Sequence, residues 1–284
     1  MRKAGWVIVV LLFCATAIWI VMRNRSMKQI SLGYQETLLS GIRPATEEIP
    51  DHVMADLPTP VIRYLEYALN GQNRIDRVAE YRQAGWIQIN IDSCFYNNTV
   101  WKYLIAENTV RLDPPAFYWQ ALIHLGWEFW RKGWLLLSSE KQELYWTWMG
   151  AVPVMQRDEP QIKKYSLGLF LLQLPWYPTA LVSTDYLQWT AIDDTSAAAT
   201  LTAYDMKVTA EFHFDAEGKI VRAVTKDMDR MTDSGFIEEA RMAKYVKYHE
   251  TAGYRLPERI FFFWKTPVGW FSDSDFRLDE IVYR

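Results

Sequence analysis

The sequence predicts an α+β fold in which an N-terminal transmembrane helix precedes a large curved antiparallel sheet that a few helices cover. Three observations support this prediction: residues 4–22 carry no charge, polar and apolar side chains alternate through most of the chain after residue 78, and no long crossover segments separate the alternating stretches. We expect about ten strands in a half-barrel arrangement, because a twisted sheet of this size has to curl, close or be covered.

The composition excludes several classes of protein. Half of the 284 residues are hydrophobic and 14 are tryptophan, which favours a large core with aromatic walls. The net charge is −3 with both signs interspersed, so the basic stripe of a nucleic-acid-binding protein is missing. Cys14 lies in the apolar N-terminal run and Cys94 is isolated, so neither has the spacing of a zinc ligand. We therefore predict no nucleic-acid partner, no metal and no other cofactor.

The uncharged segment "AGWVIVVLLFCATAIWIVM" occupies residues 4–22. As a helix it would be ~28 Å long, close to the ~30 Å hydrocarbon thickness of a bilayer. Trp6 and Trp19 lie near its two ends, where indole side chains prefer the membrane interface. A cleaved signal peptide is the alternative, but its apolar region would be shorter and would end in small residues, whereas this segment ends in "WIVMRNR". We predict an uncleaved single-pass membrane anchor.

The charges that flank this segment bear on its orientation. Arg2 and Lys3 precede it, and Arg23, Arg25 and Lys28 follow it, so the positive-inside rule is nearly balanced. A short N-terminal tail tends to stay in the cytoplasm. We therefore expect the rest of the chain to lie outside the cytoplasm.

We divide the chain into three parts. Residues 1–25 form the anchor with its flanking charges, residues 26–54 form a connecting helical segment, and residues 55–284 form a single antiparallel-sheet domain. Within this domain we expect helices near 58–70 and 159–174. Prolines open both helices, a glycine follows the first, and a proline ends the second: Pro58, Pro60, Gly71, Pro160 and Pro175.

The alternating stretches predict the strands. In "WIQINID", Ile87, Ile89 and Ile91 point to one side of the strand and the polar residues point to the other. The sequence "DAEG" at 215–218 predicts a hairpin turn. Strand patterns then continue to the end of the chain.

Several polar clusters are candidates for chemistry. Glu211, His213 and Asp215 alternate on one face of a predicted strand and could form a Glu–His dyad, although the solvated face of an amphipathic strand explains them more simply. Asp227, Asp229 and Asp233 suggest calcium, but the glycine and terminal glutamate of an EF-hand are missing, which favours a solvated hairpin loop. Because no nucleophile, phosphate-binding or metal motif occurs, we predict no catalytic residues.

Aromatic residues dominate the remaining pattern. Trp101, Tyr103 and Ile105 share one face of a predicted strand, while Leu104 and Ala106 share the other, so this strand is apolar on both faces. Both faces of such a sheet have to be covered by other elements, or one face has to line a hydrophobic space. A tryptophan-rich core without a ligand is the alternative. The residues that we expect to line a cavity are Trp101, Tyr103, Trp119, Trp146, Trp148, Trp176, Trp189 and Trp264.

The stretch "LPWYPTALVSTDYLQW", residues 174–189, links the second predicted helix to the next strand. Pro175 ends the helix, and Pro178 prevents it from restarting. We interpret this segment as a structural elbow that folds the helix against the sheet.

Several stretches together resemble a family of uncharacterised bacterial proteins, a domain of unknown function that follows a membrane anchor. They are "LPTPVIRYLEYAL", "YRQAGWIQINI", "RLDPPAFYWQALI", "LPWYPTALVSTDYLQW", "VTAEFHFDAEGKI" and "GYRLPERIFFFWK". The resemblance covers most of residues 55–284. It implies a bacterial protein at the inner membrane, and no catalytic residues are carried over from it. By architectural analogy, the predicted sheet is similar to that of bacterial lipoprotein carriers, in which a half-barrel holds acyl chains against a helical lid.

The sequence therefore favours a membrane-anchored, non-catalytic module that binds an apolar or lipid-like ligand. Two alternatives remain open. One is an enzyme that uses strand-end carboxylates and His213, and the other is an assembly or interaction protein of the bacterial envelope.

Overall fold

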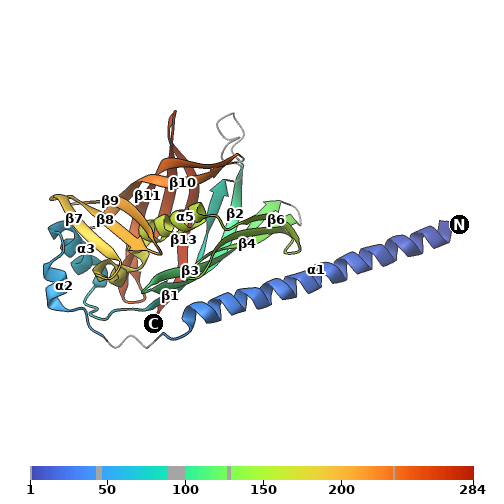
Figure 1. The fold of residues 1–284 in the computed structure, drawn as a ribbon, viewed down its shortest axis with the longest axis horizontal. Helices are drawn as coiled ribbons and strands as arrows, with labels where there is room; N and C mark the ends of the chain where they lie inside the picture. The colour runs from blue at the N-terminus through green and yellow to red at the C-terminus, as the bar shows by residue number, and fades with distance from the viewer. Residues whose placement is uncertain (1, 43–46, 89–99, 127–128, 233) are drawn as a thin grey trace.

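The computed structural model describes residues 2–42, 47–88, 100–126, 129–232 and 234–284 (Figure 1). Ile89, Ile91, Cys94 and Asp233, which the sequence interpretation used, lie outside the described residues. The described chain forms a long N-terminal helix, one large antiparallel sheet and several short helices. The predicted fold class is thereby confirmed.

The sheet contains thirteen strands, and each pairs antiparallel with its neighbours in the order β6-β5-β4-β3-β2-β1-β13-β12-β11-β10-β9-β8-β7. The first and last strands of the domain, β1 and β13, pair in the middle and join the two halves of the sheet. The sheet curves around its contents as a half-barrel (Figure 1). The strands are β1 Val78–Gln88, β2 Trp101–Leu112, β3 Pro115–Gly126, β4 Phe129–Leu137, β5 Gln142–Trp148, β6 Val152–Arg157, β7 Leu187–Asp193, β8 Ser196–Ala203, β9 Met206–Phe214, β10 Ile220–Thr232, β11 Gly235–Thr251, β12 Tyr254–Thr266 and β13 Gly269–Tyr283.

The structure has three strands more than the sequence predicted. Strands β6 and β11 were not expected, because neither has a regular apolar alternation. Strands β8 and β9 were expected as one run, but a tight turn at Tyr204 and Asp205 separates them, with φ of 54° and 60°. Such hairpin turns favour Asn–Gly or Asp–Gly. A Tyr–Asp pair therefore does not predict one.

Two helices pack against the sheet from within its curvature. Helix α5, Pro160–Leu172, crosses the concave face and contacts strands of both halves, including β4, β5, β9 and β10 (Figure 1). Helix α3, Thr59–Leu69, packs against β12 and β8 at the end of the sheet near the short helix α2, Asp51–Ala55. The apolar faces of α3 and α5 and the concave side of the sheet form one continuous core.

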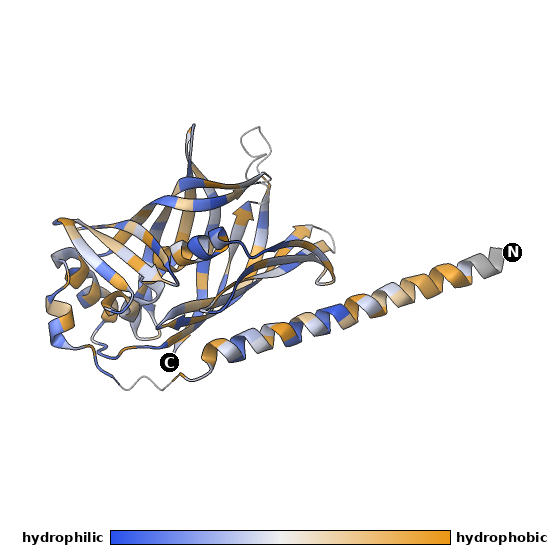
Figure 2. Cartoon of the chain, viewed as in Figure 1, coloured by the Kyte–Doolittle hydropathy of each residue, from blue (hydrophilic) through white to orange (hydrophobic). Residues whose placement is uncertain are grey.

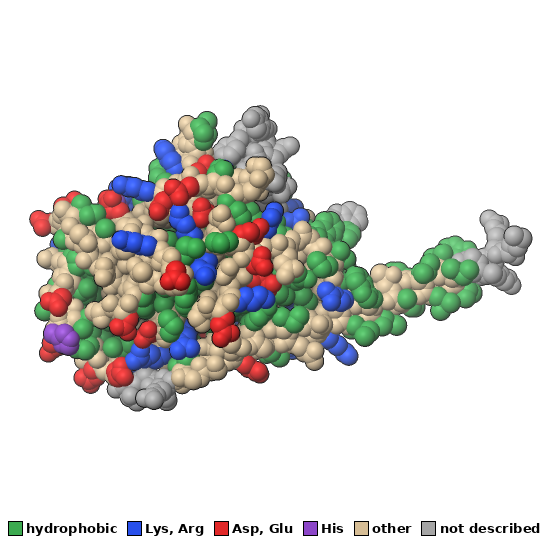
Figure 3. Space-filling model, in the orientation of Figure 1, with side chains coloured by type: hydrophobic (Ala, Val, Ile, Leu, Met, Phe, Trp, Pro, Cys, Tyr) green, Lys and Arg blue, Asp and Glu red, His purple; other side chains and the backbone are tan. Residues whose placement is uncertain are grey.

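Helix α1, Arg2–Leu39, is unbroken, so residues 26–39 continue the predicted anchor helix instead of forming a separate one. Its apolar N-terminal part projects away from the sheet, and its large hydrophobic side chains between residues 6 and 22 are exposed, except for the half-buried Ile20 (Figures 2 and 3). This helix is the one element in the described chain that is long and apolar enough to cross a membrane. Its C-terminal part packs against β2 and β3.

A small second core fastens α1 to the sheet. Met27, Tyr34 and Leu38 of the helix pack with Tyr118 and Trp134 of the sheet. Beneath them, Glu143 accepts hydrogen bonds from the Trp134 indole (2.8 Å) and the Tyr34 hydroxyl (3.2 Å).

The Glu143 carboxylate makes two further polar contacts in this second core. Its Oε2 lies 3.2 Å from the Lys141 ammonium, and its Oε1 accepts a hydrogen bond from the Gln156 amide (3.0 Å). Burial raises the pKa of Glu143, but the Trp134, Lys141 and Gln156 contacts outweigh burial and hold it below its ordinary value. The ionised carboxylate therefore keeps the buried donors of this second core paired.

The elbow after α5 consists of two short 3-10 turns, Leu174–Trp176 and Pro178–Val182. Every residue of both turns is buried. Trp176 donates a hydrogen bond from its indole to the carbonyl of Pro257 (2.8 Å), which ties the elbow to β12. The segment thus holds α5 against the sheet, as the positions of its prolines indicate.

Candidate functional site

A cavity of about 210 Å³ lies between α5 and the concave face of the sheet. Its walls are mainly apolar and come from β3, β4, β5 and α5, with contributions from β1, β2 and β10–β13. An engineered apolar cavity of about 150 Å³ is large enough to bind benzene. The space here is therefore sufficient for a substantial apolar group. The apolar residues that form its walls include Phe117, Trp119, Leu135, Leu144, Trp146 and Leu169.

Two tryptophans form the aromatic part of this wall. The rings of Trp119 on β3 and Trp146 on β5 meet edge to face with centroids 5.9 Å apart. Between their strands, β4 places Gly133 directly opposite Trp146. A Cβ at Gly133 would lie 2.6 Å from the Trp146 ring, so the glycine is what allows the indole to lie across β4. Both indoles are half-buried, because they face the cavity.

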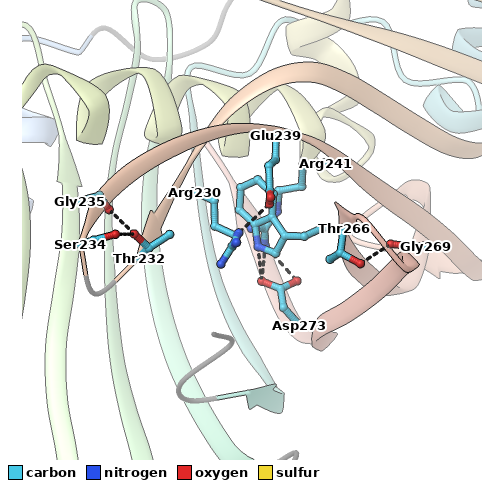
Figure 4. A network of polar contacts seen from close by, with 10 residues as sticks. Arg230, Thr232, Ser234, Gly235, Glu239, Arg241, Thr266, Gly269 and Asp273 are labelled. Atoms are coloured by element: carbon cyan, nitrogen blue, oxygen red, sulfur yellow. Dashed lines mark hydrogen bonds and ion pairs between the residues drawn. The ribbon is translucent and has the colours of Figure 1, made fainter. Parts of the chain in front are cut away.

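A buried ion pair forms the opposite wall of the cavity. The Arg241 guanidinium on β11 lies 3.0 Å from the Asp273 carboxylate on β13 (Figure 4). The Trp264 indole also donates a hydrogen bond to Asp273 (3.2 Å), and the Arg241 guanidinium lies over the Trp264 ring, 4.3 Å from its centroid. Burial raises the pKa of Asp273, and the positive charge of Arg241 opposes this effect. The pair is fully enclosed, with side-chain exposures of 3% and 7%.

A second ion pair lies beside the first. Arg230 on β10 contacts Glu239 on β11 at 2.7 Å (Figure 4). Asp229 also borders the cavity, and burial raises its pKa. The arginines of this wall are thus matched by carboxylates, so the wall does not present a net positive charge to a ligand.

The cavity wall on β1 and β2 is polar but uncharged. Gln83 and Asn108 border the cavity there, together with Gln173 at the end of α5. The side-chain Oε1 of Gln173 lies 3.4 Å from the Tyr81 hydroxyl and 3.3 Å from the Tyr177 hydroxyl. The two hydroxyls also share a hydrogen bond of 2.8 Å, so one of them donates to the other and the second donates to Gln173. Burial raises the pKa of both tyrosines, so both hydroxyls stay protonated as donors.

A second cavity of about 270 Å³ lies between the α2 region, the start of β1 and the elbow. Asp76 borders it and accepts a hydrogen bond from the Tyr254 hydroxyl (2.6 Å), while Arg74 lies 3.0 Å from the same carboxylate. Burial raises the pKa of Asp76, and its bonded partners lower it by less. The Asp76 backbone N–H also donates a hydrogen bond to the Thr179 hydroxyl (3.3 Å). These contacts connect the start of β1, β12 and the elbow, which is a structural role.

The sequence of this chain matches a known protein family. Residues 47–273 match the model of a family of unknown function, DUF6544. The chain belongs to this family. None of the curated proteins matches this DUF6544 protein in sequence.

Two solved structures are similar in outline. A LolA superfamily protein from Nitrosomonas europaea is 11% identical, with a TM-score of 0.38, over 79% of the DUF6544 chain and 92% of its own. A putative outer membrane lipoprotein-sorting protein domain from Vibrio parahaemolyticus is 6% identical, with a TM-score of 0.35, over 73% and 85%.

Three of the eight residues expected at a cavity border the one described here. Trp119 and Trp146 form its aromatic wall, and Trp264 holds the ion pair. The structure places the other five elsewhere. They are Trp101, Tyr103, Trp148, Trp176 and Trp189.

These five residues fall into two groups. Trp101 and Trp148 are exposed, and Tyr103 packs edge to face on the exposed Trp86 (5.5 Å), on the outer face of β1 and β2. Trp176 is fully buried in the elbow, and Trp189 donates a hydrogen bond to the Leu181 carbonyl (3.0 Å) at the core.

The polar candidates also have defined places. His213 and Glu211 do contact each other (3.1 Å) on β9, on the face opposite the buried Phe212 and Phe214. Burial lowers the pKa of His213, and Arg222 adds to this effect. The pair borders neither of the two cavities described.

The predicted hairpin loop at Asp227 and Asp229 is wrong. Both residues lie within β10, next to an irregularity in its pairing with β11 between Thr225 and Met228. The strand was expected to end earlier because three acidic residues in close succession are typical of a loop.

Sequence reasoning missed several polar residues of the cavity wall, among them Gln83, Asn108 and Arg241. Gln83 follows Tyr81 and precedes Ile87 on the inward-facing side of β1, so a polar residue in an apolar pattern could have identified it. Arg241 had no such pattern, because β11 has mixed polarity on both faces.

Proposed function

We propose that this DUF6544 protein is a membrane-anchored module that binds an apolar or lipid-like ligand in the cavity beneath α5, without catalysing a reaction. The observation that carries this proposal is the cavity itself, whose walls are mainly aromatic and aliphatic and contain a few converging polar groups. Ligand sites typically have this composition. The cavity-facing side chains Trp119 and Trp146 on the sheet and Leu169 on α5 are half-buried although they lie on the core side of the domain.

The contacts of α1 support a position at the membrane surface. Asn24 lies two residues after the apolar segment, and its side-chain amide donates hydrogen bonds to the backbone carbonyls of Ile20 and Met149, both at 2.9 Å. Met149 lies in the turn between β5 and β6, next to Gly150, which has a φ of 68°. A Cβ at position 150 would lie 2.0 Å from the side-chain Oδ1 of Asn24. This turn is therefore fastened to the helix where the proposed membrane span ends.

A cavity-filling variant tests ligand binding. Leu169→Trp places an indole in the cavity from the α5 side, so we expect at least about a tenfold loss of bound ligand, because a ligand would have to displace the indole from the cavity. The measurement is native mass spectrometry of the full chain released from detergent, followed by identification of the retained molecules. Their class should be apolar or lipid-like.

The matched control is Ile105→Trp on the outer face of β2, where the side chain is exposed. It adds an indole of similar size without entering the cavity, and should retain the ligand as the native chain does. Equal retention by both variants, or no retained molecule in the native chain, would contradict the proposal.

The position at the membrane has its own test. Val152, the first residue of β6, is 48% exposed and lies three residues after Met149, which Asn24 contacts. Ile192 on β7 is 50% exposed and lies at the other end of the sheet order. In a chain without native cysteines, an environment-sensitive fluorophore on Val152→Cys should shift its emission to shorter wavelengths in lipid nanodiscs. The same label on Ile192→Cys should not. No shift at position 152 would show that the β5–β6 turn stands away from the bilayer.

A further inference from the structure

Two amides in the cavity wall have polar atoms without a partner. Both the Nε2 and the Oε1 of Gln83, and the Nδ2 of Asn108, are buried and make no hydrogen bond in the described structure. Gln83 is 0% exposed and Asn108 is 5% exposed. Both side chains border the cavity. Buried polar groups in native proteins almost always have partners, so an unpaired group at a cavity points to a ligand that supplies them.

The strand register brings the two amides together. Gln83 on β1 lies opposite Ala106 on β2, and Asn108 lies opposite Tyr81. The two amides are therefore diagonal neighbours on the same face of adjacent strands, within reach of one bound group. Together they offer two NH₂ groups as donors, from Gln83 and Asn108, and one oxygen as an acceptor, from Gln83.

The charges around the cavity indicate what kind of group fits. Gln83, Asn108 and Gln173 are all neutral. The Arg241 Nε also lacks a partner, but its guanidinium is already paired with Asp273 and lies over an aromatic ring. Because Glu239 and Asp273 pair with the two arginines of the wall, and Asp229 borders the cavity as well, an anionic group would gain no net attraction there.

We propose that Gln83 and Asn108 bind an uncharged polar group that both donates and accepts hydrogen bonds, an amide or a hydroxyl, at the head of an apolar chain. The chain then lies along Trp119 and Trp146. This inference deepens the proposed function and rests on it, since it assigns the class of amphiphile that the cavity selects.

Three probes with the same number of non-hydrogen atoms separate the possibilities: decanamide, decanoate and dodecane. The delipidated full chain is incubated with pairs of probes, and native mass spectrometry gives the ratio of the bound species. We expect the native chain to prefer decanamide to dodecane and to decanoate by at least about tenfold, since a small number of net hydrogen bonds is worth that factor. A preference for decanoate would assign the site to anions and overturn the proposal.

Substitution of the amides by apolar residues of similar size tests their role. In Gln83→Met with Asn108→Leu, the decanamide-to-dodecane ratio should fall to about one while dodecane still binds. The ligand-free variant should also unfold at a higher temperature than the native chain, because unpaired buried amides have been removed. The control is Thr109→Val, next to Asn108 but on the other face of β2, which should keep the native ratio.

The outcomes are distinguishable. If the native chain binds none of the probes, or if Leu169→Trp binds them equally well, the proposed function fails. If dodecane binds but the ratio is unchanged in the double variant, the amides do not recognise the ligand and this inference alone is overturned. A lower unfolding temperature of both single variants, Gln83→Met and Asn108→Leu, would show that these amides are satisfied without a ligand, and would overturn it as well.

Discussion

Asp273→Ala is expected to lower the free energy of unfolding by about 3–5 kcal/mol, the cost of leaving a buried cation without its partner. Asp273 accepts hydrogen bonds from Arg241 (3.0 Å) and Trp264 (3.2 Å), and all three side chains are almost fully buried. After the substitution, Arg241 would be a buried charge with no counterion. Guanidinium-induced unfolding of the full chain in mild detergent, followed by far-ultraviolet circular dichroism, measures the change.

The controls separate the lost charge from lost packing. Asp279→Ala removes the carboxylate of a more exposed pair, Arg277–Asp279 at 2.9 Å, and should cost no more than about 1 kcal/mol. The double variant Arg241→Met with Asp273→Leu replaces both charges by apolar groups and should recover most of the stability. If Asp273→Ala were no worse than Asp279→Ala, Arg241 would have to be solvated, and the enclosed wall described here would be wrong.

Trp176→Ala should destabilise the chain by about 3–5 kcal/mol, as large-to-small substitutions of buried aromatic residues do. The Trp176 side chain is 0% exposed, packs edge to face on the Tyr81 ring (5.4 Å), and donates a hydrogen bond to the Pro257 carbonyl. Its own carbonyl accepts a hydrogen bond from the Tyr283 hydroxyl (2.6 Å). The elbow is thus joined to β1, β12 and β13 at once.

The same unfolding measurement applies, with Trp270→Ala as the control. Trp270 on β13 is 40% exposed, so its removal leaves no internal cavity and should have a small effect. A change in Trp176→Ala no greater than that of the control would mean that the elbow is not part of the core, and that α5 is held by other contacts.

Much of the fold follows from local pattern. Residues 6–22 are apolar on every side of the helix, and this pattern predicts a segment that is buried in a protein core or in a membrane. The prolines around 58–60 and at 160 and 175 lie at helix ends in the structure, because proline lacks the N–H that a helix interior needs. Strands with regular alternation were found for the same reason, since one face of each packs against the core.

The missed strands show where local pattern is insufficient. Strand β11 contains Arg241 at a buried position and glutamates elsewhere, so its side chains do not alternate in polarity. Its place in the sheet depends on a partner, Asp273, more than thirty residues further along the chain. The Arg241 charge can be buried because Asp273 pairs with it. A short stretch of sequence around Arg241 does not include this partner.

The sequence by itself determined that this chain has a long apolar N-terminal helix and an antiparallel sheet rich in tryptophan. It also determined which residues share each face of a strand: Trp101 with Tyr103, and Leu104 with Ala106. Only the tertiary structure decided that the face with Leu104 and Ala106 is the concave one. For this reason Gln83 and Asn108 border the cavity, whereas Trp101 is exposed. The physical reason is that the alternation of side chains separates the two faces of a strand but does not show which face becomes the inner, concave one. The direction of curvature depends on which face packs against α5, and that contact joins residues far apart in the chain.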